Sequence, residues 1–323
     1  MKLGVLTVCV ADMDLDNALS YLSNIGVQAV EIGCGGFPGT AHANAEEFIK
    51  NPALIDEFLS AIKKYPLIIS ALSVHGNPVH PQKEISEQYH RQFEAAVLLA
   101  EKLGVDTVIG FSGCPGDCEG SRYPNWVTCA WPPDFQEILK YQWDEVLIPY
   151  WKKAAQFALE HGVTKIALEM HPGFCVYNPH TLLKLRKAVG GDIIGANFDP
   201  SHLFWQGIDP VAAARELRGA IHHFHAKDTR IDPYKCAVNG VLDTTSLANV
   251  DERSWLFRTV SYGHGEMLWR DLISELRAGG YDHVISIEHE DILMSPREGL
   301  EKAVEFLKSV MVFEPMGDEV WWA

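Results

Sequence analysis

The chain has 323 residues, of which 47% are hydrophobic, so it is long enough for two modest domains or for one large α/β barrel. Its formal net charge of −16, without a long basic run, argues against binding to the phosphate backbone of nucleic acids. No apolar stretch approaches the roughly 20 residues that a membrane-spanning helix requires, which argues against insertion into a bilayer.

The amino terminus and the cysteines indicate the cellular compartment. The apolar run in MKLGVLTV is soon followed by acidic residues, which is typical of a first strand and not of a signal peptide. The seven cysteines are odd in number and scattered, which favours reduced thiols over a disulfide framework. We therefore expect a cytoplasmic protein.

Apolar runs alternate with amphipathic segments along the whole chain. In chain order, the apolar runs predict strands within residues 2–8, 29–35, 67–76, 106–113, 165–172, 192–202, 220–228 and 283–291. The amphipathic segments predict helices over residues 14–26, 51–65, 83–104, 141–162, 178–190, 209–219, 267–280 and 295–311.

Eight such units without a dividing linker predict an α/β fold, namely a (β/α)8 TIM barrel that forms a single domain over residues 1–323. Two doubly wound domains are the alternative. We rank them lower because the glycine-rich stretch EIGCGGFPG carries Pro38 where a dinucleotide-binding helix would begin.

Two connections, 112–140 after the fourth strand and 229–266 after the seventh, are longer than usual and therefore candidates for function. Both follow strands, so both should lie on the carboxyl-terminal face of the barrel, where the chemistry of this fold is found. The first contains four aromatic residues that could form a wall for a sugar ring or a partner chain, or a satellite hydrophobic cluster: Tyr123, Trp126, Trp131 and Phe135.

Four predicted strands end in a carboxylate or an imidazole, and the four residues are Glu169, Asp199, His225 and Glu288. Because strand ends converge in a barrel, these side chains should point at one region. Three carboxylates so close would repel one another unless they are protonated or bridged by a cation. An oxygen-rich set with one imidazole suits Mn²⁺, Mg²⁺ or Co²⁺.

The pattern of Glu169, the Asp-x-x-His of Asp199 and His202, His225 within HAKD, and Glu288 resembles the xylose-isomerase-like superfamily of sugar (phosphate) isomerases and epimerases. The resemblance covers nearly the whole chain. It implies that Glu169, Asp199, His225 and Glu288 bind one divalent metal, usually Mn²⁺, with Mg²⁺, Co²⁺ and Zn²⁺ as alternatives.

The resemblance also implies a reaction on a ketose or keto-glycoside. Glu169 and Glu288 would act as acid and base beside a sugar carbonyl, through a metal-stabilised enediolate. Isomerisation, epimerisation and β-elimination from a 3-keto-glycoside share this first step and stay open. His202, the last residue of the Asp-x-x-His, is implied to tune the site or face the substrate without holding the metal.

Further polar residues are candidates for substrate binding. His75 ends the third strand, and His171 has the same strand parity as Glu169. Arg230 is the nearest match to an arginine that such epimerases carry shortly after the metal-binding histidine, and Lys227 could take its place. His264 lies in a glycine-flanked turn and could equally be a solvated turn residue.

The expected partner is a small-molecule sugar or glycoside, with neither nucleic acid nor membrane. We expect a homo-oligomer, with an additional small subunit as an alternative composition. Trp321 and Trp322 should dock on this chain or on a neighbouring one. Two functions of other classes are an apurinic-endonuclease-like nuclease, disfavoured by the net charge, and a non-catalytic barrel that binds a sugar or a partner.

Overall fold

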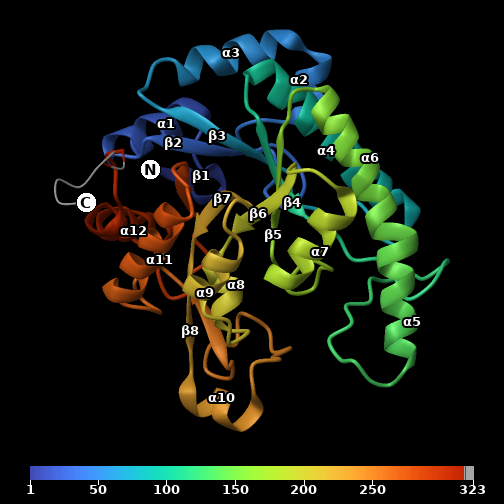
Figure 1. Cartoon of the computed structure of the whole chain (residues 1–323). Coiled ribbons are helices and arrows are strands. Elements are labelled where there is room, and N and C mark those ends of the chain that lie inside the picture. The colour runs from blue at the N-terminus through green and yellow to red at the C-terminus, as the bar shows by residue number, and fades with distance from the viewer. Residues whose placement is uncertain (316, 318–323) are drawn as a thin grey trace.

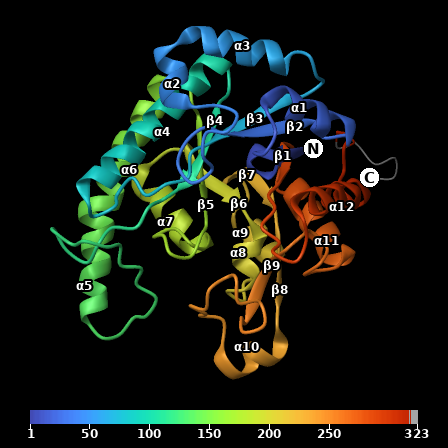
Figure 2. The same cartoon turned by 180° about the vertical axis from the view of Figure 1, so that it is seen from behind.

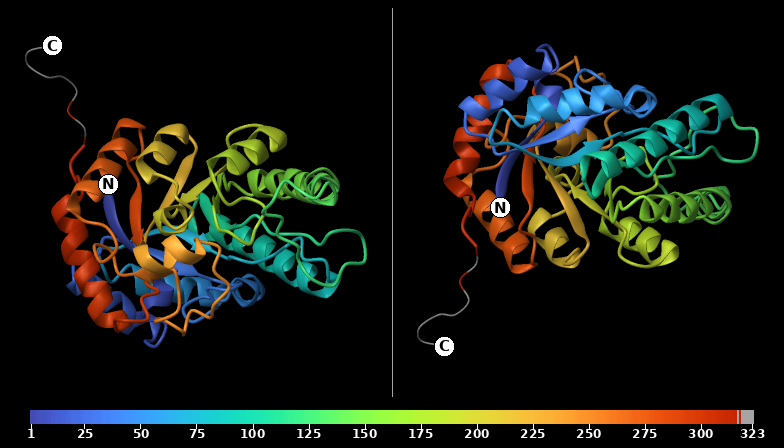
Figure 3. Two further views of the ribbon diagram at one scale, coloured as in Figure 1. Left: turned by 90° about the horizontal axis from the view of Figure 1, so that it is seen from below. Right: turned by 90° about the horizontal axis from the view of Figure 1, so that it is seen from above.

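Eight parallel strands close into a barrel with helices arranged around it, as the views along the barrel show (Figure 3). The computed structural model describes residues 1–315 and 317, so Trp321 and Trp322 lie outside the described residues. The barrel strands are β1 (Lys2–Leu6), β2 (Ala29–Gly33), β3 (Ile68–Ser73), β4 (Thr107–Phe111), β5 (Lys165–Glu169), β6 (Ile194–Phe198), β7 (Ile221–Ala226) and β10 (Val284–Ile287). Their order around the barrel is β1-β10-β7-β6-β5-β4-β3-β2, which confirms the predicted TIM barrel.

The main helices of the outer ring agree with the predicted amphipathic segments (Figure 1). They are α1 (Leu15–Asn24), α3 (Pro52–Ile62), α4 (Lys83–Leu103), α6 (Ile148–Glu160), α7 (Pro179–Val189), α9 (Pro210–Glu216), α11 (Glu266–Ala278) and α12 (Pro296–Val310). Short helices α2 (Ala45–Lys50) and α8 (Pro200–Phe204) and a 3₁₀ turn at Thr7–Val10 complete the connections. None of the described helices is long and apolar enough to cross a membrane.

The two long connections carry secondary structure of their own. In the first, α5 (Asp134–Lys140) and a π-helical segment (Tyr141–Leu147) run into α6, so the helix begins earlier than predicted. In the second, β8 (Asp228–Ile231) and β9 (Trp255–Arg258) form an antiparallel pair on either side of α10 (Pro233–Asn239). Both connections project beyond the same end of the barrel (Figures 1 and 2).

The barrel strands are buried on both faces, and their side chains alternate between the two. In β7, Phe224 and Ala226 belong to the large hydrophobic core shared with the helices. His223 and His225, of opposite parity, are fully buried and contact residues of other barrel strands. The apolar strands therefore carry inward polar side chains, and these build the site.

Candidate metal centre

Four side chains from neighbouring strand ends meet at the carboxyl-terminal end of the barrel. Glu169 ends β5, Asp199 follows β6, His225 lies in β7 and Glu288 follows β10. Each offers a ligand atom within 4.8 Å of the others. The structure therefore brings together the four residues that the sequence singled out, while their role as metal ligands stays a prediction.

His225 is oriented by a buried carboxylate behind it. Its Nε2 donates to Glu31, 2.9 Å from Oε1 and 3.0 Å from Oε2. Its Nδ1 lies 3.0 Å from Glu288 Oε2 and 3.2 Å from Glu169 Oε2, but has no partner in hydrogen-bonding geometry. Burial would lower the pKa of His225, yet the facing carboxylates of Glu31 and Glu288 raise it well above its usual value. Nδ1 thus faces the carboxylates as a ligand would.

Glu31, in the middle of β2, is a site residue that the sequence reasoning missed. It is fully buried and also accepts hydrogen bonds from the hydroxyls of Ser73 and Ser286. Burial favours the neutral acid, but His225 and His223 outweigh it and lower the pKa of Glu31 to about 2. The available clue was a carboxylate inside the apolar strand AVEIG. It escaped notice because it does not lie at a strand end.

Asp199 divides its two oxygens between the backbone and the site. Oδ1 accepts from the backbone N–H of Ser201, 2.8 Å away, and so caps α8. Oδ2 is buried without a hydrogen-bond partner, although the Lys227 ammonium lies 3.1 Å away. Burial raises the pKa of Asp199 to about 7, against the opposing effect of Lys227.

The donor set fits a divalent cation. Two buried atoms, Asp199 Oδ2 and His225 Nδ1, lack a hydrogen-bond partner in the described part of the chain, and both face the same carboxylates. Such atoms are costly to bury unless something completes their coordination. Behind them, the Glu31–His225 hydrogen bond is the kind of contact that orients a metal-binding imidazole in proteins.

Lys227 lies beside this set and is buried. Its ammonium is 2.9 Å from Glu288 Oε2 and 3.2 Å from Glu290 Oε2, and it lies 4.9 Å from the ring centre of Phe257. Burial would lower the pKa of Lys227, but these carboxylates and Asp199 raise it well above its usual value. Lys227 therefore neutralises and positions carboxylates, and its part in substrate binding stays a prediction.

Three histidines gather around Glu169. His75 Nε2 lies 3.1 Å from Glu169 Oε2, and His202 Nε2 lies 3.1 Å from Glu169 Oε1. The rings of His171 and His202 have their centres 4.0 Å apart. Burial lowers the pKa of His202 to about 3, which favours its neutral form. The structure thus brings His75, His171 and His202 to the site.

Two other candidates lie elsewhere. Arg230 is exposed on β8, where it pairs with Leu256, and the structure does not bring it to the four strand-end residues. His264 is held by Asp228, 2.7 Å from its Nδ1, and its ring stacks on Phe204 with centres 3.7 Å apart. The contacts with Asp228 and Phe204 therefore hold His264 within its turn.

A cleft of about 380 Å³ opens over the candidate metal centre. Phe37, Phe111 and Phe174 form an apolar wall, in which the last two rings stack 4.3 Å apart. Glu169, which is 2% exposed, and Glu288 also line the cleft, whereas Asp199 and His225 do not line it and are fully buried.

The aromatic residues of the first long connection do not line this cleft within the described residues. Trp131 and Tyr123 are largely exposed, and Trp126 packs against Tyr177 with ring centres 5.5 Å apart. The wall predicted from this connection is therefore supplied by other residues, because the connection extends away from the strand ends (Figure 1).

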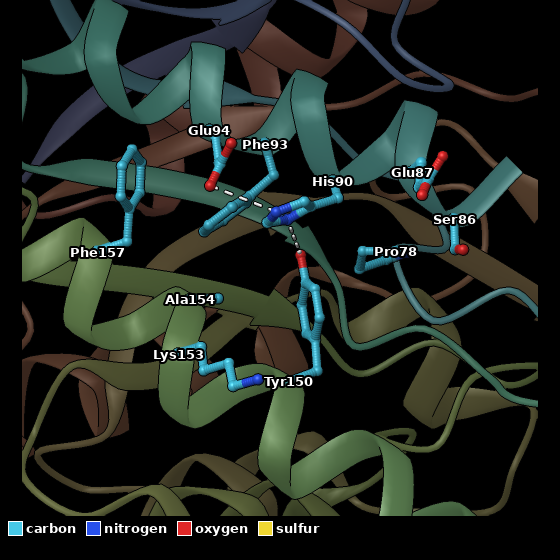
Figure 4. Close-up of a pocket in the computed structure, with 10 residues that line it drawn as sticks. All are labelled: Pro78, Ser86, Glu87, His90, Phe93, Glu94, Tyr150, Lys153, Ala154 and Phe157. Atoms are coloured by element: carbon cyan, nitrogen blue, oxygen red, sulfur yellow. Dashed lines mark hydrogen bonds and ion pairs between the residues drawn. The ribbon is translucent and has the colours of Figure 1, made fainter. Parts of the chain in front are cut away.

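A second cavity, also of about 380 Å³, lies between α4 and α6 on the outside of the barrel (Figure 4). His90 lies at its centre, 3.3 Å from the Tyr150 hydroxyl and 3.3 Å from Glu94. This cavity shares no lining residue with the cleft over the metal centre.

Comparison with known families agrees with this architecture. The model of the xylose isomerase-like TIM barrel family matches residues 19–310, so the chain belongs to that family.

Two relatives match over nearly the full length. The chain is 39% identical over 313 residues to the uncharacterized protein YfiH of Bacillus subtilis, covering 96% of this chain and 99% of that protein. It is 25% identical over 318 residues to an inosose dehydratase of Clostridium beijerinckii, covering 95% and 96%.

Solved structures share the fold at lower identity. The IolI protein, whose structure holds a zinc atom, superposes with a TM-score of 0.65 at 17% identity, over 96% of this chain and 98% of that one. The 3-keto-D-glucoside 4-epimerase YcjR of E. coli gives a TM-score of 0.64 at 13% identity, over 96% and 99%. At these identities the likeness shows the fold alone.

Proposed function

We propose that this protein is a divalent-metal-dependent enzyme that moves a proton beside the carbonyl of a ketose or keto-glycoside, as an isomerase or epimerase. The observation that carries this proposal is that two of the four candidate metal ligands line the cleft and two do not. Glu169 and Glu288 line the cleft, whereas Asp199 and His225 do not. Two carboxylates can thus reach a substrate in the cleft while all four side chains share one cation.

The two glutamates approach from different sides. In the barrel, β10 and β5 flank the pair β7 and β6, so Glu288 and Glu169 lie on either side of His225. A cation bound here would supply Lewis-acid stabilisation of the charge that develops when the proton beside the carbonyl leaves.

The surrounding residues fix where the proton can be held. Glu288 Oε2 is engaged by Lys227 at 2.9 Å, which leaves Oε1 to accept a proton from the substrate. Glu169 Oε2 accepts from Asn197 at 3.0 Å, so its Oε1, beside His202, is the oxygen that can return a proton. Delivery to the neighbouring carbon gives isomerisation, and delivery to the opposite face of the same carbon gives epimerisation.

The cleft favours an uncharged sugar. Phe37, Phe111 and Phe174 offer apolar surface to a sugar ring, whereas no lysine or arginine lines the cleft within the described residues. Glu290 adds a further negative charge. A phosphorylated sugar would meet repulsion here without a cationic partner.

Elimination at the same site is the second candidate, because it shares the first proton transfer. The similarity to an inosose dehydratase over 95% of the chain favours this alternative. It differs only in that a group on the adjacent carbon leaves after the proton has been removed.

The proposal is tested by a substrate screen in heavy water with Mn²⁺-loaded protein. Free ketoses, sugar phosphates and 3-keto-glycosides are incubated, and deuterium uptake is followed by NMR. We expect uptake beside the carbonyl of an unphosphorylated substrate, and its loss after chelation. Equal turnover by the chelated protein would overturn the proposal.

A further inference from the structure

A row of buried polar side chains crosses three neighbouring strands inside the barrel and ends at Glu169. The parallel register pairs Glu169 of β5 with Asn197 of β6, and Asn197 in turn with His223 of β7. All three residues are at most 2% exposed. The interior layers of such barrels are usually filled by bulky apolar residues. Polar side chains are costly in this position unless they bond to one another.

The side chains of this row do form a series of hydrogen bonds. Asn197 Nδ2 donates to Glu169 Oε2 at 3.0 Å. His223 Nδ1 lies 3.2 Å from Asn197 Oδ1. On the other side of the imidazole, Nε2 lies 3.3 Å from the hydroxyl oxygen of Ser70 in β3. The series therefore extends from the far side of the barrel to one of the two glutamates of the proposed reaction.

Glu169 determines how the Asn197 amide is oriented. An ionised carboxylate only accepts hydrogen bonds, so the amide must turn its NH₂ group toward Glu169 and its oxygen toward His223. Because that oxygen also only accepts, His223 Nδ1 must carry a proton. Glu31 does not take this hydrogen bond, because its Oε2 lies 3.8 Å from Nδ1. Both N–H groups of the row thus point toward Glu169.

The row engages one oxygen of Glu169 and leaves the other. Oε2 accepts from Asn197 and lies 3.1 Å from His75 Nε2. Oε1 lies beside His202, and it is the oxygen that the proposed reaction requires to be free. Two contacts on the same oxygen oppose rotation of the carboxylate, which would exchange Oε1 and Oε2.

We propose that His223 is a positioning residue of this site: it fixes the Asn197 amide, which holds Glu169 Oε2 and keeps Oε1 free to exchange a proton. The role of Oε1 rests on the proposed function, whereas the hydrogen bonds of the row do not. Within the described residues, neither His223 nor Asn197 lines the cleft, so both act through Glu169 and not on the substrate.

The proton on His223 can be observed without metal or substrate. In ¹⁵N-labelled, metal-free protein, NMR correlation of the carbon-bound ring protons with the ring nitrogens distinguishes the imidazole tautomers. The His223 signals are identified by their loss in His223→Asn. We expect a proton on Nδ1. A His223 ring protonated on Nε2 alone would overturn the proposal, because the Asn197 amide would then have to turn its oxygen toward Glu169.

Two substitutions of His223 separate positioning from packing. In His223→Asn, the amide nitrogen takes the place of Nδ1, so a donor to Asn197 is kept although the ring is lost. His223→Leu fills the space without a donor. We expect His223→Leu to bind Mn²⁺ about 10- to 100-fold more weakly, the usual effect of losing a group that orients a metal ligand, and His223→Asn to stay close to wild type.

The matched control is His283→Leu. The His283 ring centre lies 6.0 Å from that of His223, and its Nε2 lies 3.4 Å from the carbonyl oxygen of Ser70. This variant therefore removes a neighbouring imidazole outside the row, and it should bind Mn²⁺ as the wild type does.

The outcomes keep this inference apart from the proposed function. Equal losses of Mn²⁺ affinity in His223→Leu and His223→Asn would assign His223 to packing and overturn the inference, as would wild-type affinity in both folded variants. A wild type that binds no Mn²⁺ would overturn the proposed function, and the tautomer of His223 would then decide the inference by itself.

Discussion

A single buried carboxylate, Glu31, determines which nitrogen of His225 faces the candidate metal centre. Because His225 Nε2 donates to Glu31, Nδ1 is the ring nitrogen that faces Glu169 and Glu288. The hydroxyls of Ser73 and Ser286 also donate to Glu31, and His223 Nδ1 lies 3.8 Å from its Oε2. The carboxylate therefore remains charged in a fully buried position.

Glu31→Gln keeps the shape of this side chain and removes its charge. We expect Mn²⁺ affinity to fall about 10- to 100-fold, as is typical when the group that orients a metal-binding residue is lost. Competition with a fluorescent chelator measures the change. The matched control is Glu305→Gln on the exposed face of α12, and equal affinities in the two variants would contradict this role of Glu31.

His202→Ala should separate metal binding at the four-residue set from turnover. His202 is not one of the four, so the ion at Glu169, Asp199, His225 and Glu288 should be retained. Turnover should fall by about 10²-fold or more, because a group positioned beside Glu169 Oε1 is lost. Elemental analysis and a turnover assay on the same preparation decide the matter. A folded variant that retains no metal would contradict the four-residue set.

The affinity for metal should depend on pH through Asp199. Its pKa in the folded, metal-free protein is raised to about 7, so below that pH a cation must displace a proton. The pKa of His225 is also raised, which adds a second proton. We therefore expect Mn²⁺ affinity to fall at least about tenfold per pH unit below 7. Equilibrium dialysis across this range tests it, and a flat profile would contradict the assignment.

The raised pKa of Asp199 also makes the stability of the metal-free protein depend on pH. The folded pKa of Asp199 is about 7, whereas its ordinary value is 3.8, so this residue ionises at lower pH in the unfolded chain than in the folded protein. The free energy of unfolding of the metal-free protein should therefore fall as the pH rises from about 4 to about 7. Glu31, with a pKa lowered to about 2, contributes stability above its ordinary pKa and loses it as the pH falls toward 2. Bound metal should remove the cost at Asp199.

Among structural elements, the arm formed by β8, α10 and β9 is joined to the site through Asp291 as well as through Phe257. Asp291 follows Glu288 and Glu290 in the same loop, and its side chain is buried. It accepts from Arg258 Nε at 3.0 Å and from the backbone N–H of Thr259 at 2.8 Å. These bonds join the loop that carries Glu288 to the arm whose Phe257 ring lies beside Lys227.

Asp291→Ala should destabilise the protein by about 3 kcal/mol, because it leaves the guanidinium of Arg258 without its partner. Amide exchange in β8 and β9 should accelerate more than in the barrel strands. Chemical denaturation and hydrogen exchange measure the two effects. Asp271→Ala, at an exposed position of α11, serves as the control. Equal stability of the two variants would contradict this role of Asp291.

The elements that could be predicted from the sequence are those with strong periodicity. The apolar runs of the eight barrel strands and the long amphipathic helices were recognised because each is buried on a defined face. β8 and β9 were not recognised, because each has four residues and alternates only partly between buried and exposed positions. Their pairing depends on contacts between residues far apart in the chain.

The same reasoning explains which site residues could be found. Glu169, Asp199 and Glu288 stand out because a polar residue ends an apolar run. Glu31 and Asn197 lie inside such runs, and only the closed barrel shows that they face its interior. The contacts of Glu290 and Phe257 with Lys227 depend on loop conformation, which strand periodicity does not encode.

At the scale of the whole molecule, the barrel brings carboxylates from distant parts of the chain together at one end. The net charge of the chain is negative as well. A formal charge of −16 is compatible with a small uncharged substrate and unfavourable for DNA, which argues against the nuclease alternative. The long connections after β4 and β7 project from the same end (Figures 1 and 2).

The central claim is that Glu169 and Glu288 exchange protons with a sugar carbon beside a carbonyl. The measurement that tests it most directly is solvent deuterium uptake into the substrate at saturating Mn²⁺, in wild type, Glu169→Gln and Glu288→Gln. We predict uptake in the wild type and a loss of about 10²- to 10⁴-fold in each variant, the usual effect of removing a positioned acid or base. Wild-type turnover without any uptake, or wild-type rates in both variants, would contradict the claim.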